Sequence, residues 1–471
     1  MAFQRKLSRA ETAAMSVAVI AMTVGMALNT PFVAAPAGAS VPLVFVVSTI
    51  GVLCIAASFI RLSSRVSHAG SVYGLIRYAQ GRSPGFIAGW ALLLTYGLFV
   101  TAALCGFGLF TSMLLDPVIH LPWALYTVLA GAAVWWTNYR DIKLSTRIML
   151  VIELFSIVLM LVVAVIIVGR QPFTVEPFKL GASGLVGFSQ GLVFGIMTFV
   201  GFEAAASMGE EAKDAGRDVP FAIIATVLVA GLFFTFVSYA QTVGYGIGDI
   251  KSLASAATPM NDLATRYIGA PMAMAIEFCC AVSTFAMAVG SAAASSRLLL
   301  ALSRDGFLPP ALASLNRFNS PGLASNVIMA LNAVLFVALA AWHDNASDLY
   351  GYTSTVATFT VIIAYTMMAA ATLSRFGAED RARGKLYMSA LPVVGIVLLA
   401  YTLFVNIYPV PDYPFNVLPY IVIAYMALGF VVLLATRRSQ TQGNIQHYVL
   451  ADSNPSPSGA GEVSSDMKGV A

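Results

Sequence analysis

The chain has 471 residues, of which 59% are hydrophobic and only 10% are charged, and its formal net charge is +4. A soluble domain of ordinary composition carries about 25% charged residues, so this composition excludes a soluble globular protein and predicts an integral membrane protein. The net charge is too small to indicate a nucleic acid partner.

Twelve apolar stretches lie between Glu11 and Arg437, and each is long enough to cross a bilayer. About 20 helical residues span the roughly 30 Å hydrocarbon core, because a helix rises about 1.5 Å per residue. The first stretch continues past Pro31 without a small-residue cleavage site, so it predicts a spanning helix and not a signal peptide. The predicted spans cover residues 12–35, 41–60, 84–115, 121–138, 146–168, 188–209, 219–245, 267–302, 322–342, 349–373, 387–408 and 415–436.

Lysine and arginine are distributed unevenly between the two sides of this twelve-span arrangement. With the N-terminus placed in the cytoplasm, 22 of the 26 basic residues fall on the cytoplasmic side. The positive-inside rule predicts this asymmetry, and one span more or fewer would reverse every later loop. We therefore expect a multi-pass protein of the cell (inner or plasma) membrane with the N-terminal segment 1–11 and the C-terminus both cytoplasmic. The tail, residues 439–471, is rich in Ser, Gly, Asn and Pro and is predicted to be disordered.

Two of the spans share an interruption near their middles. The first contains the helix-weakening residues of Gly25–Pro31, and the sixth contains those of Gly195–Gly201. Long loops also recur five spans apart, at Arg61–Arg82 and at Gly246–Arg266. Interrupted helices in oppositely oriented halves are typical of inverted-repeat transporters, in which the substrate binds beside the breaks. The alternative is that these Gly and Pro residues only permit close helix packing.

Three acidic residues, Glu153, Glu203 and Glu277, lie within the predicted spans. A charge at the bilayer centre costs at least about 2.5 kcal/mol, so these residues are expected to face the bundle interior or to be protonated. Glu203 lies beside the second interruption. There it either exchanges a proton between access states or only bonds free backbone amides and pins the break. Glu153 and Glu277 are predicted to be vestibule residues paired with a hydroxyl or a backbone group.

Uncharged side chains near the breaks are further candidates. Tyr96, Phe199 and Phe202 can close over a substrate, although aromatic residues in membrane helices more often pack or anchor. Ser283 and Thr284 can ligate sodium or bond their own helix backbone. The four cysteines and four histidines form no ligand cluster or catalytic constellation, so we expect no metal centre and no cofactor. The chain is not expected to be an enzyme.

Several of these segments resemble the amino acid–polyamine–organocation (APC) superfamily. They occur in the expected order and in both halves of the chain, and the likeness extends from Ala10 to about Arg438. The sixth-helix signature is matched by Phe199–Glu203, Glu210 with Glu211, Arg217–Pro220 and Ala222 with Ile223. The loop after the second helix is matched by Gly70–Tyr73 and Tyr78–Gly81. The end of the eighth helix is matched by Ser296–Pro309, and the segment after that helix by Ser320 with Pro321.

The resemblance implies an all-α integral membrane fold of the LeuT type with 12 transmembrane helices. Residues 12–168 and 188–373 would form a five-plus-five inverted repeat, and residues 387–436 two additional C-terminal helices. The implied function is secondary transport of amino acids or related amines by alternating access, with the substrate between the unwound parts of broken helices 1 and 6. Contacts to its carboxylate end would come from Val24, Gly25, Met26 and Ala27, and contacts to its ammonium end from Phe199, Val200, Gly201 and Phe202, with Tyr96 facing the site from the third helix.

Two positions depart from the family pattern. Met26 follows Gly25 where the family has a small residue, which narrows the expected carboxylate pocket. Glu153 stands at the position that we match to a fifth-helix lysine of some proton-coupled members, whereas Glu203 matches a glutamate used in proton-linked gating. Glu153 at this position argues against a lysine mechanism and leaves the coupling ion open. We assign the coupling role to Glu203 and Glu153 and expect protons to be the coupling ion.

Three alternatives stay open at this point. They are a sodium symporter that uses Ser283 and Thr284, a substrate exchanger, and a non-transporting amino acid sensor, or transceptor. The expected partners are an amino acid or amine substrate, a proton or sodium ion, and membrane lipid. The sequence does not distinguish a monomer from a dimer.

Overall fold

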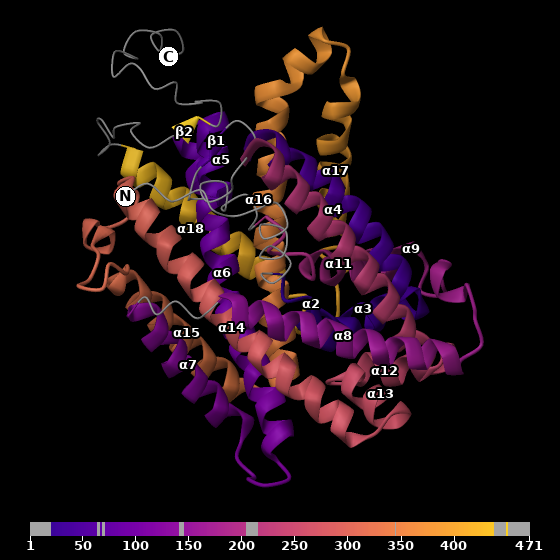
Figure 1. The fold of residues 1–471 in the computed structure, drawn as a ribbon. Helices are drawn as coiled ribbons and strands as arrows, with labels where there is room; N and C mark the ends of the chain where they lie inside the picture. The colour runs from indigo at the N-terminus through magenta and orange to yellow at the C-terminus, as the bar shows by residue number, and fades with distance from the viewer. Residues whose placement is uncertain are drawn as a thin grey trace.

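The computed structural model describes residues 20–63, 66–67, 71–140, 146–203, 215–343, 345–437 and 449–450. These residues form a bundle of long helices that cross one another closely (Figure 1). The N-terminal segment and the greater part of the tail, for which we predict a cytoplasmic location and disorder, lie outside the described residues. Within the tail, strand β2 (Val449–Leu450) pairs antiparallel with β1 (Val66–Ser67).

The first half of the chain contains α2 (Met22–Val24), the π-helix η1 (Gly25–Asn29), α3 (Thr30–Ala37), η2 (Gly38–Ser40), α4 (Val41–Ser63), α5 (Ser71–Gln80), α6 (Arg82–Leu115), α7 (Trp123–Tyr139), α8 (Thr146–Arg170) and η3 (Glu176–Phe178). The second half contains α9 (Gly184–Met197), α11 (Ala215–Tyr245), η5 (Ile247–Asp249), α12 (Ile250–Ser255), α13 (Pro259–Tyr267), α14 (Ala270–Arg304), η6 (Pro310–Ala313), α15 (Gly322–Trp342), α16 (Ala346–Ala382), α17 (Leu386–Val405) and α18 (Leu418–Arg437).

The described residues contain nine helical runs that are apolar and long enough to cross a membrane. One of these runs, Met22–Ser63, holds the first two predicted spans, with η2 between them. The fourth predicted span coincides with a shorter helix, α7 of 17 residues, and the sixth overlaps only in its first half with α9 of 14 residues. The chain is therefore a multi-pass membrane protein, whereas the count of twelve spans stays a prediction.

Outward-facing apolar side chains support this conclusion. Val151 and Phe155 on α8, and Ile423 and Phe430 on α18, are all exposed although they are large and hydrophobic. A soluble protein rarely exposes apolar surface on this scale, because water disfavours it. The hydrocarbon of a bilayer is the surrounding in which such a surface is stable.

In four of the five predicted repeat pairs, helices that stand five spans apart in the sequence pack against each other, whereas the described residues of α8 and α16 do not. The contacting pairs are α3 with α9, α4 with α11, α6 with α14, and α7 with α15. A two-fold relation between two halves of a chain brings corresponding elements together near its axis. The two C-terminal helices pack outside these pairs, with α17 on α16 and α4, and α18 on α16 and α6.

Each of the two predicted long loops carries helices of its own. The loop after the second span contains α5, which packs on α6 and α16. The loop after the seventh span contains η5, α12 and α13, and α13 packs on η1, α8, α11 and α14. Both loops therefore pack against the bundle: α5 lies on two of its longest helices, and α13 lies on the first interruption and its neighbours.

Candidate functional site

The first interruption is a π-helix, Gly25–Asn29, placed between α2 and α3. In π-helical register the carbonyl of Met26 would accept from the amide of residue 31, which is Pro31 and has no N–H. Side chains bond this carbonyl instead: Gln241 Nε2 at 2.9 Å and Thr30 Oγ1 at 3.3 Å. The first break therefore stays helical, which differs from the unwound segment that the resemblance implies.

The second interruption follows the end of α9 at Met197 and continues as turns through Glu203. Gly201 has a φ of 109°, in a region that residues with a side chain rarely adopt. This conformation turns the chain so that the Gly201 amide donates to Glu203 Oε2 at 3.0 Å. A glycine at this position is thus a requirement of the break.

The two interruptions contact each other directly. Asn29 Nδ2 donates to Thr198 Oγ1 at 2.9 Å, and the Tyr350 hydroxyl of α16 donates to Asn29 Oδ1 at 2.8 Å. A side-chain carbon built on Gly25 would lie 2.5 Å from the Thr198 methyl, so the close approach needs glycine there. The structure therefore places Gly25, within the predicted group Val24–Ala27, beside Thr198, which directly precedes the predicted group Phe199–Phe202.

Glu203 closes the second break and is only 2% exposed. Its carboxylate accepts hydrogen bonds from Tyr365 of α16 at 2.7 Å, from the Gly201 amide, and from Tyr96 of α6 at 3.3 Å. Three donors offset much of the cost of burying a carboxylate away from water. Glu203 thus links the second break to α6 and α16. Tyr96, which is predicted to face the site, lies beside this carboxylate.

The aromatic residues of the second break are packed into the core. The Phe202 ring lies 5.2 Å from that of Phe59 on α4 and 5.5 Å from that of Tyr365, measured between ring centroids. The Phe199 ring lies 5.0 Å from that of Phe234 on α11. Phe199 and Phe202 are therefore held by α4, α11 and α16 in this conformation.

Glu153 of α8 bonds the first span at the start of α2. It accepts from the Thr23 amide at 3.1 Å, from the Thr23 hydroxyl at 3.1 and 3.2 Å, and from Ser283 of α14 at 2.7 Å. The residue before α2 is Ala21, whose side chain cannot cap a helix. The Glu153 carboxylate, which belongs to another helix, supplies the missing cap. Its negative charge is also stabilised there, because the N-terminal end of a helix dipole is positive.

The hydroxyls predicted as sodium ligands already have partners. Ser283 donates to Glu153, and Thr284 Oγ1 donates to the carbonyls of Cys280 and Ala281 at 2.8 and 2.9 Å. Among the residues that the structure describes, no group of three or more His, Cys, Asp or Glu side chains has the placement of a metal site. Glu277, predicted to pair with a hydroxyl or backbone group, accepts instead from the Asn261 side chain.

Five further residues complete the two breaks and were not singled out from the sequence: Thr23, Asn29, Thr198, Gln241 and Tyr365. All are buried polar side chains on apolar helices or beside the breaks. The signal that could have found most of them is polarity itself, because an uncharged polar residue inside a membrane helix also needs a partner. The pairing of residues far apart in the sequence cannot be read from one chain.

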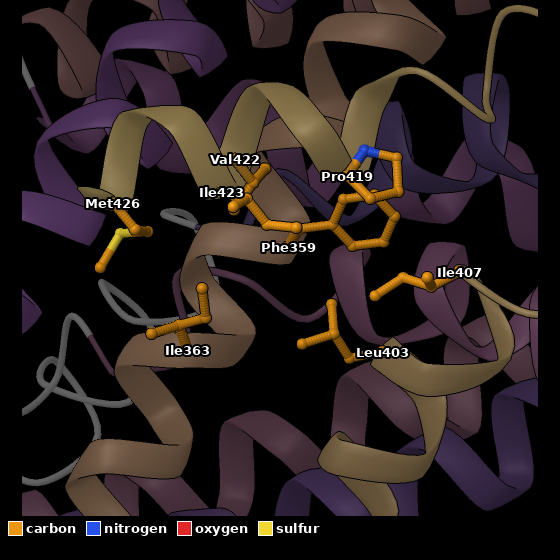
Figure 2. Close-up of a pocket in the computed structure, with 8 residues that line it drawn as sticks. All are labelled: Phe359, Ile363, Leu403, Ile407, Pro419, Val422, Ile423 and Met426. Carbon is orange, nitrogen blue, oxygen red and sulfur yellow. The ribbon is translucent and has the colours of Figure 1, made fainter. Parts of the chain in front are cut away.

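Away from the breaks, residues of α16, of α17 and the turn after it, and of α18 line an open apolar pocket of about 220 Å³ (Figure 2). No predicted site residue lines it, and it carries no charged group that could bind the carboxylate or the ammonium of an amino acid. The lining residues are Phe359, Ile363, Leu403, Ile407, Pro419, Val422, Ile423 and Met426. This pocket is therefore separate from the candidate site.

Comparison with known proteins agrees with this architecture. The chain is 30% identical to the branched-chain amino acid permease BcaP of Bacillus subtilis, over 64% of this chain and 68% of that protein. It is 24% identical to the low-affinity putrescine importer PlaP of Escherichia coli K12, over 72% of this chain and 74% of that protein. It is 27% identical to a methylthioribose transporter of Bacillus subtilis, over 61% of this chain and 65% of that protein.

The family match covers almost the entire helical bundle. Residues 7–433 match the family described as "Amino acid permease". The APC resemblance is confirmed by this match, as is the prediction of a transporter and not an enzyme. The chain belongs to the amino acid permease family of the APC superfamily.

Proposed function

We propose that the protein is a secondary active transporter that carries amino acids or related amines across the cell membrane by alternating access and is coupled to protons. Two of the relatives are named for branched-chain amino acids and putrescine, which supports a small substrate with amino acid or amine character. The third is named for methylthioribose, a small sugar derivative without an amino group. The substrate would bind where the breaks meet, between Val24–Ala27 and Phe199–Phe202, with Tyr96 beside it.

The observation that carries this proposal is the position of Glu203. It is a buried carboxylate whose partners come from the second break itself and from α6 and α16. Protonation removes its charge and weakens its hold on the Gly201 amide and on both tyrosine hydroxyls. The proton would in this way loosen the break from the surrounding helices, so that the break moves only when the proton is bound.

Glu153 is proposed as a second coupling residue. Its carboxylate holds the start of α2 against α8 and α14 through Thr23 and Ser283. Each broken helix thus has one carboxylate that attaches it to the bundle.

The architecture supports the same proposal. We infer twelve spans, with residues 12–168 and 188–373 as inverted repeats, residues 387–436 as two added helices, and both termini in the cytoplasm. Support comes from the contacts between helices five spans apart and from the opposed breaks. The distribution of basic residues supports the orientation.

The proposal is tested by Glu203→Gln in proteoliposomes. A thermal-shift screen of amino acids and amines first identifies a ligand, whose uptake is then measured with and without an inwardly directed proton gradient. Gln keeps the shape of the side chain but cannot ionise, so we expect exchange across the membrane to continue while gradient-driven accumulation falls to the level without a gradient.

Glu176→Gln is the matched control, because this carboxylate is exposed in η3. It should accumulate substrate as the unchanged protein does. Proton-driven accumulation that survives in Glu203→Gln removes the coupling role of Glu203. Uptake that requires sodium and ignores the proton gradient favours a sodium symporter, and ligand binding without flux in any gradient favours a sensor.

A further inference from the structure

The helix α13 covers the first break from the side predicted to be external (Figure 1). It packs on η1, α8, α11 and α14. Gln241 of α11 joins it to the break, since the Gln241 amide nitrogen lies 2.9 Å from the Met26 carbonyl and 3.8 Å from the Met260 sulfur of α13. A group bound at α13 would therefore be close to the meeting point of the two breaks.

Between α13 and α14, the side chains of Asn261 and Glu277 have hydrogen-bond acceptor atoms that lack donors. Asn261 of α13 donates through Nδ2 to Glu277 Oε1 of α14 at 3.0 Å. The carboxylate fixes the orientation of the amide, because only the NH₂ end of Asn261 can face it. The other end, Asn261 Oδ1, is buried and has no hydrogen-bond partner, and the residue is only 2% exposed.

The Glu277 carboxylate is also incompletely satisfied. It is 8% exposed, and among the described residues the Asn261 amide is its one hydrogen-bond partner. The single basic residue of α13, Arg266, does not compensate it: Arg266 contacts the Gly244 carbonyl and the Tyr245 ring on α11. The buried Glu277 carboxylate therefore has a single N–H donor and no positively charged partner among the described residues, and the buried Asn261 amide oxygen has no donor at all.

We propose that Glu277 and Asn261 form an ammonium-binding subsite, which holds the amino group of a substrate before it reaches the breaks. A primary ammonium carries one positive charge and three N–H donors, so it satisfies the carboxylate and the amide oxygen together. A hard metal ion such as Ca²⁺ takes about six to eight oxygen ligands, many more than this pair offers. That the ammonium belongs to a substrate rests on the proposed function, whereas the binding of an ammonium does not.

The position of Glu277 on α14 suits a stage before the main site. Ser283, which bonds Glu153, follows Glu277 by six residues on the same helix, a rise of about 9 Å. An amino group moving inward from Glu277 along α14 would therefore approach the start of α2. The subsite would select for amines at the entrance, separately from the carboxylate and ammonium contacts at the breaks.

The test is amide hydrogen exchange of α13 in the purified full-length protein, with n-butylammonium as the probe and n-butanol as its uncharged counterpart. Butylammonium joins α13 to α14, so it should slow exchange in residues 259–267 by about tenfold at ten times its dissociation constant. Butanol and sodium ion at the same concentrations should not. Glu277→Gln, which keeps a bond to Asn261, and Asn261→Leu, which removes the amide oxygen, should each abolish the effect, whereas Glu203→Gln should retain it.

Three outcomes overturn the subsite: equal protection of α13 by butanol or sodium, undiminished protection in both Glu277→Gln and Asn261→Leu, or protection that disappears in Glu203→Gln but not in Glu277→Gln. Failure of the proposed function looks different. If α13 is protected as expected but no flux occurs in proteoliposomes, the ammonium subsite stands and the assignment as a transporter is wrong.

Discussion

The three buried glutamates of the predicted spans differ in how many donors surround their carboxylates. Glu203 has a backbone amide and two tyrosine hydroxyls, and Glu153 has a backbone amide and two hydroxyls. Glu277 has one amide side chain. A fully bonded carboxylate holds the elements around it together, whereas an incompletely bonded one still needs a partner. By this count of donors, Glu203 and Glu153 attach the broken helices to the bundle, whereas Glu277 is suited to bind a ligand.

Gly25 provides a direct test of the contact between the breaks. Gly25→Ala places a carbon 2.5 Å from the Thr198 methyl, so the two interruptions must separate. We expect a loss of about 1–3 kcal/mol in stability, typical of an overpacked core, and strongly reduced transport. Thr198→Ser removes that methyl but keeps the hydroxyl that accepts from Asn29, so the double variant should recover most of the loss. Thermal unfolding and uptake of the four proteins measure the cycle.

Gly97→Ala on α6 is the matched control, because an added carbon there has no neighbour within 4 Å. It should unfold and transport like the unchanged protein, or slightly better, since alanine favours a helix. If Thr198→Ser does not rescue Gly25→Ala, the two breaks are not coupled through this contact.

At this scale the sequence predicts which residues are unusual but not what they contact. Gly25, Gly201 and Glu203 are recognisable because each is costly or helix-weakening in an apolar span. Tyr365 and Asn29 could not be assigned, because their partners lie 162 and 169 residues away in the chain. Nothing local to either residue indicates such a distant partner.

At the scale of elements, the two breaks are built differently. The first is a π-helix, stabilised by Gln241 and by Thr30 at the Met26 carbonyl, and the second is a turn that depends on Gly201. The sequence predicts two interruptions, because Pro31 removes a donor and glycine weakens helices. Whether the freed groups are satisfied by a wider helical turn or by a true break depends on neighbouring side chains, which the local sequence does not specify.

The helix α5 is attached to the end of α14 by a compact polar cluster. Tyr73 and Arg77 of α5 both donate to the Asp305 carboxylate, and Arg82 donates to the Asp305 carbonyl at 2.6 Å. Burial, together with the adjacent Asp305 carboxylate, raises the pKa of Tyr73, so its hydroxyl stays protonated and able to donate. This cluster closes the side of the bundle that is predicted to be cytoplasmic.

We predict that Asp305→Ala loosens α5 without unfolding the bundle. Two hydrogen bonds to a charged acceptor are lost, each worth about 1.5–3 kcal/mol, so local opening of residues 71–80 should become at least about tenfold more frequent. Amide hydrogen exchange, followed peptide by peptide, measures this directly. Asp249→Ala, which removes an exposed carboxylate from η5, is the control and should leave α5 unchanged. Uniform acceleration in every helix would instead show global destabilisation.

At the scale of the whole molecule, helices five spans apart lie against one another, from α3 with α9 to α7 with α15. The sequence predicts a repeat through paired interruptions and paired loops, yet it does not predict which faces meet. Those contacts depend on small residues that allow close approach, such as Gly191 against Ala37 and Gly231 against Thr49. Similar glycines in other positions have no neighbour, so composition alone does not locate the interfaces.

The orientation of the bundle gives a final prediction. All four native cysteines are buried, so a cysteine introduced at an exposed position is the one that a membrane-impermeant maleimide labels. Val118, 81% exposed after α6, is predicted to be external, and Leu386, 60% exposed at the start of α17, is predicted to be cytoplasmic. Val118→Cys should therefore react in intact cells, and Leu386→Cys only after permeabilisation. The unsubstituted chain, as the control, should react in neither condition. If Leu386→Cys reacts in intact cells and Val118→Cys only after permeabilisation, the basic loops lie outside, against the positive-inside rule. In that case α5 would lie on the external side and α13 on the cytoplasmic side.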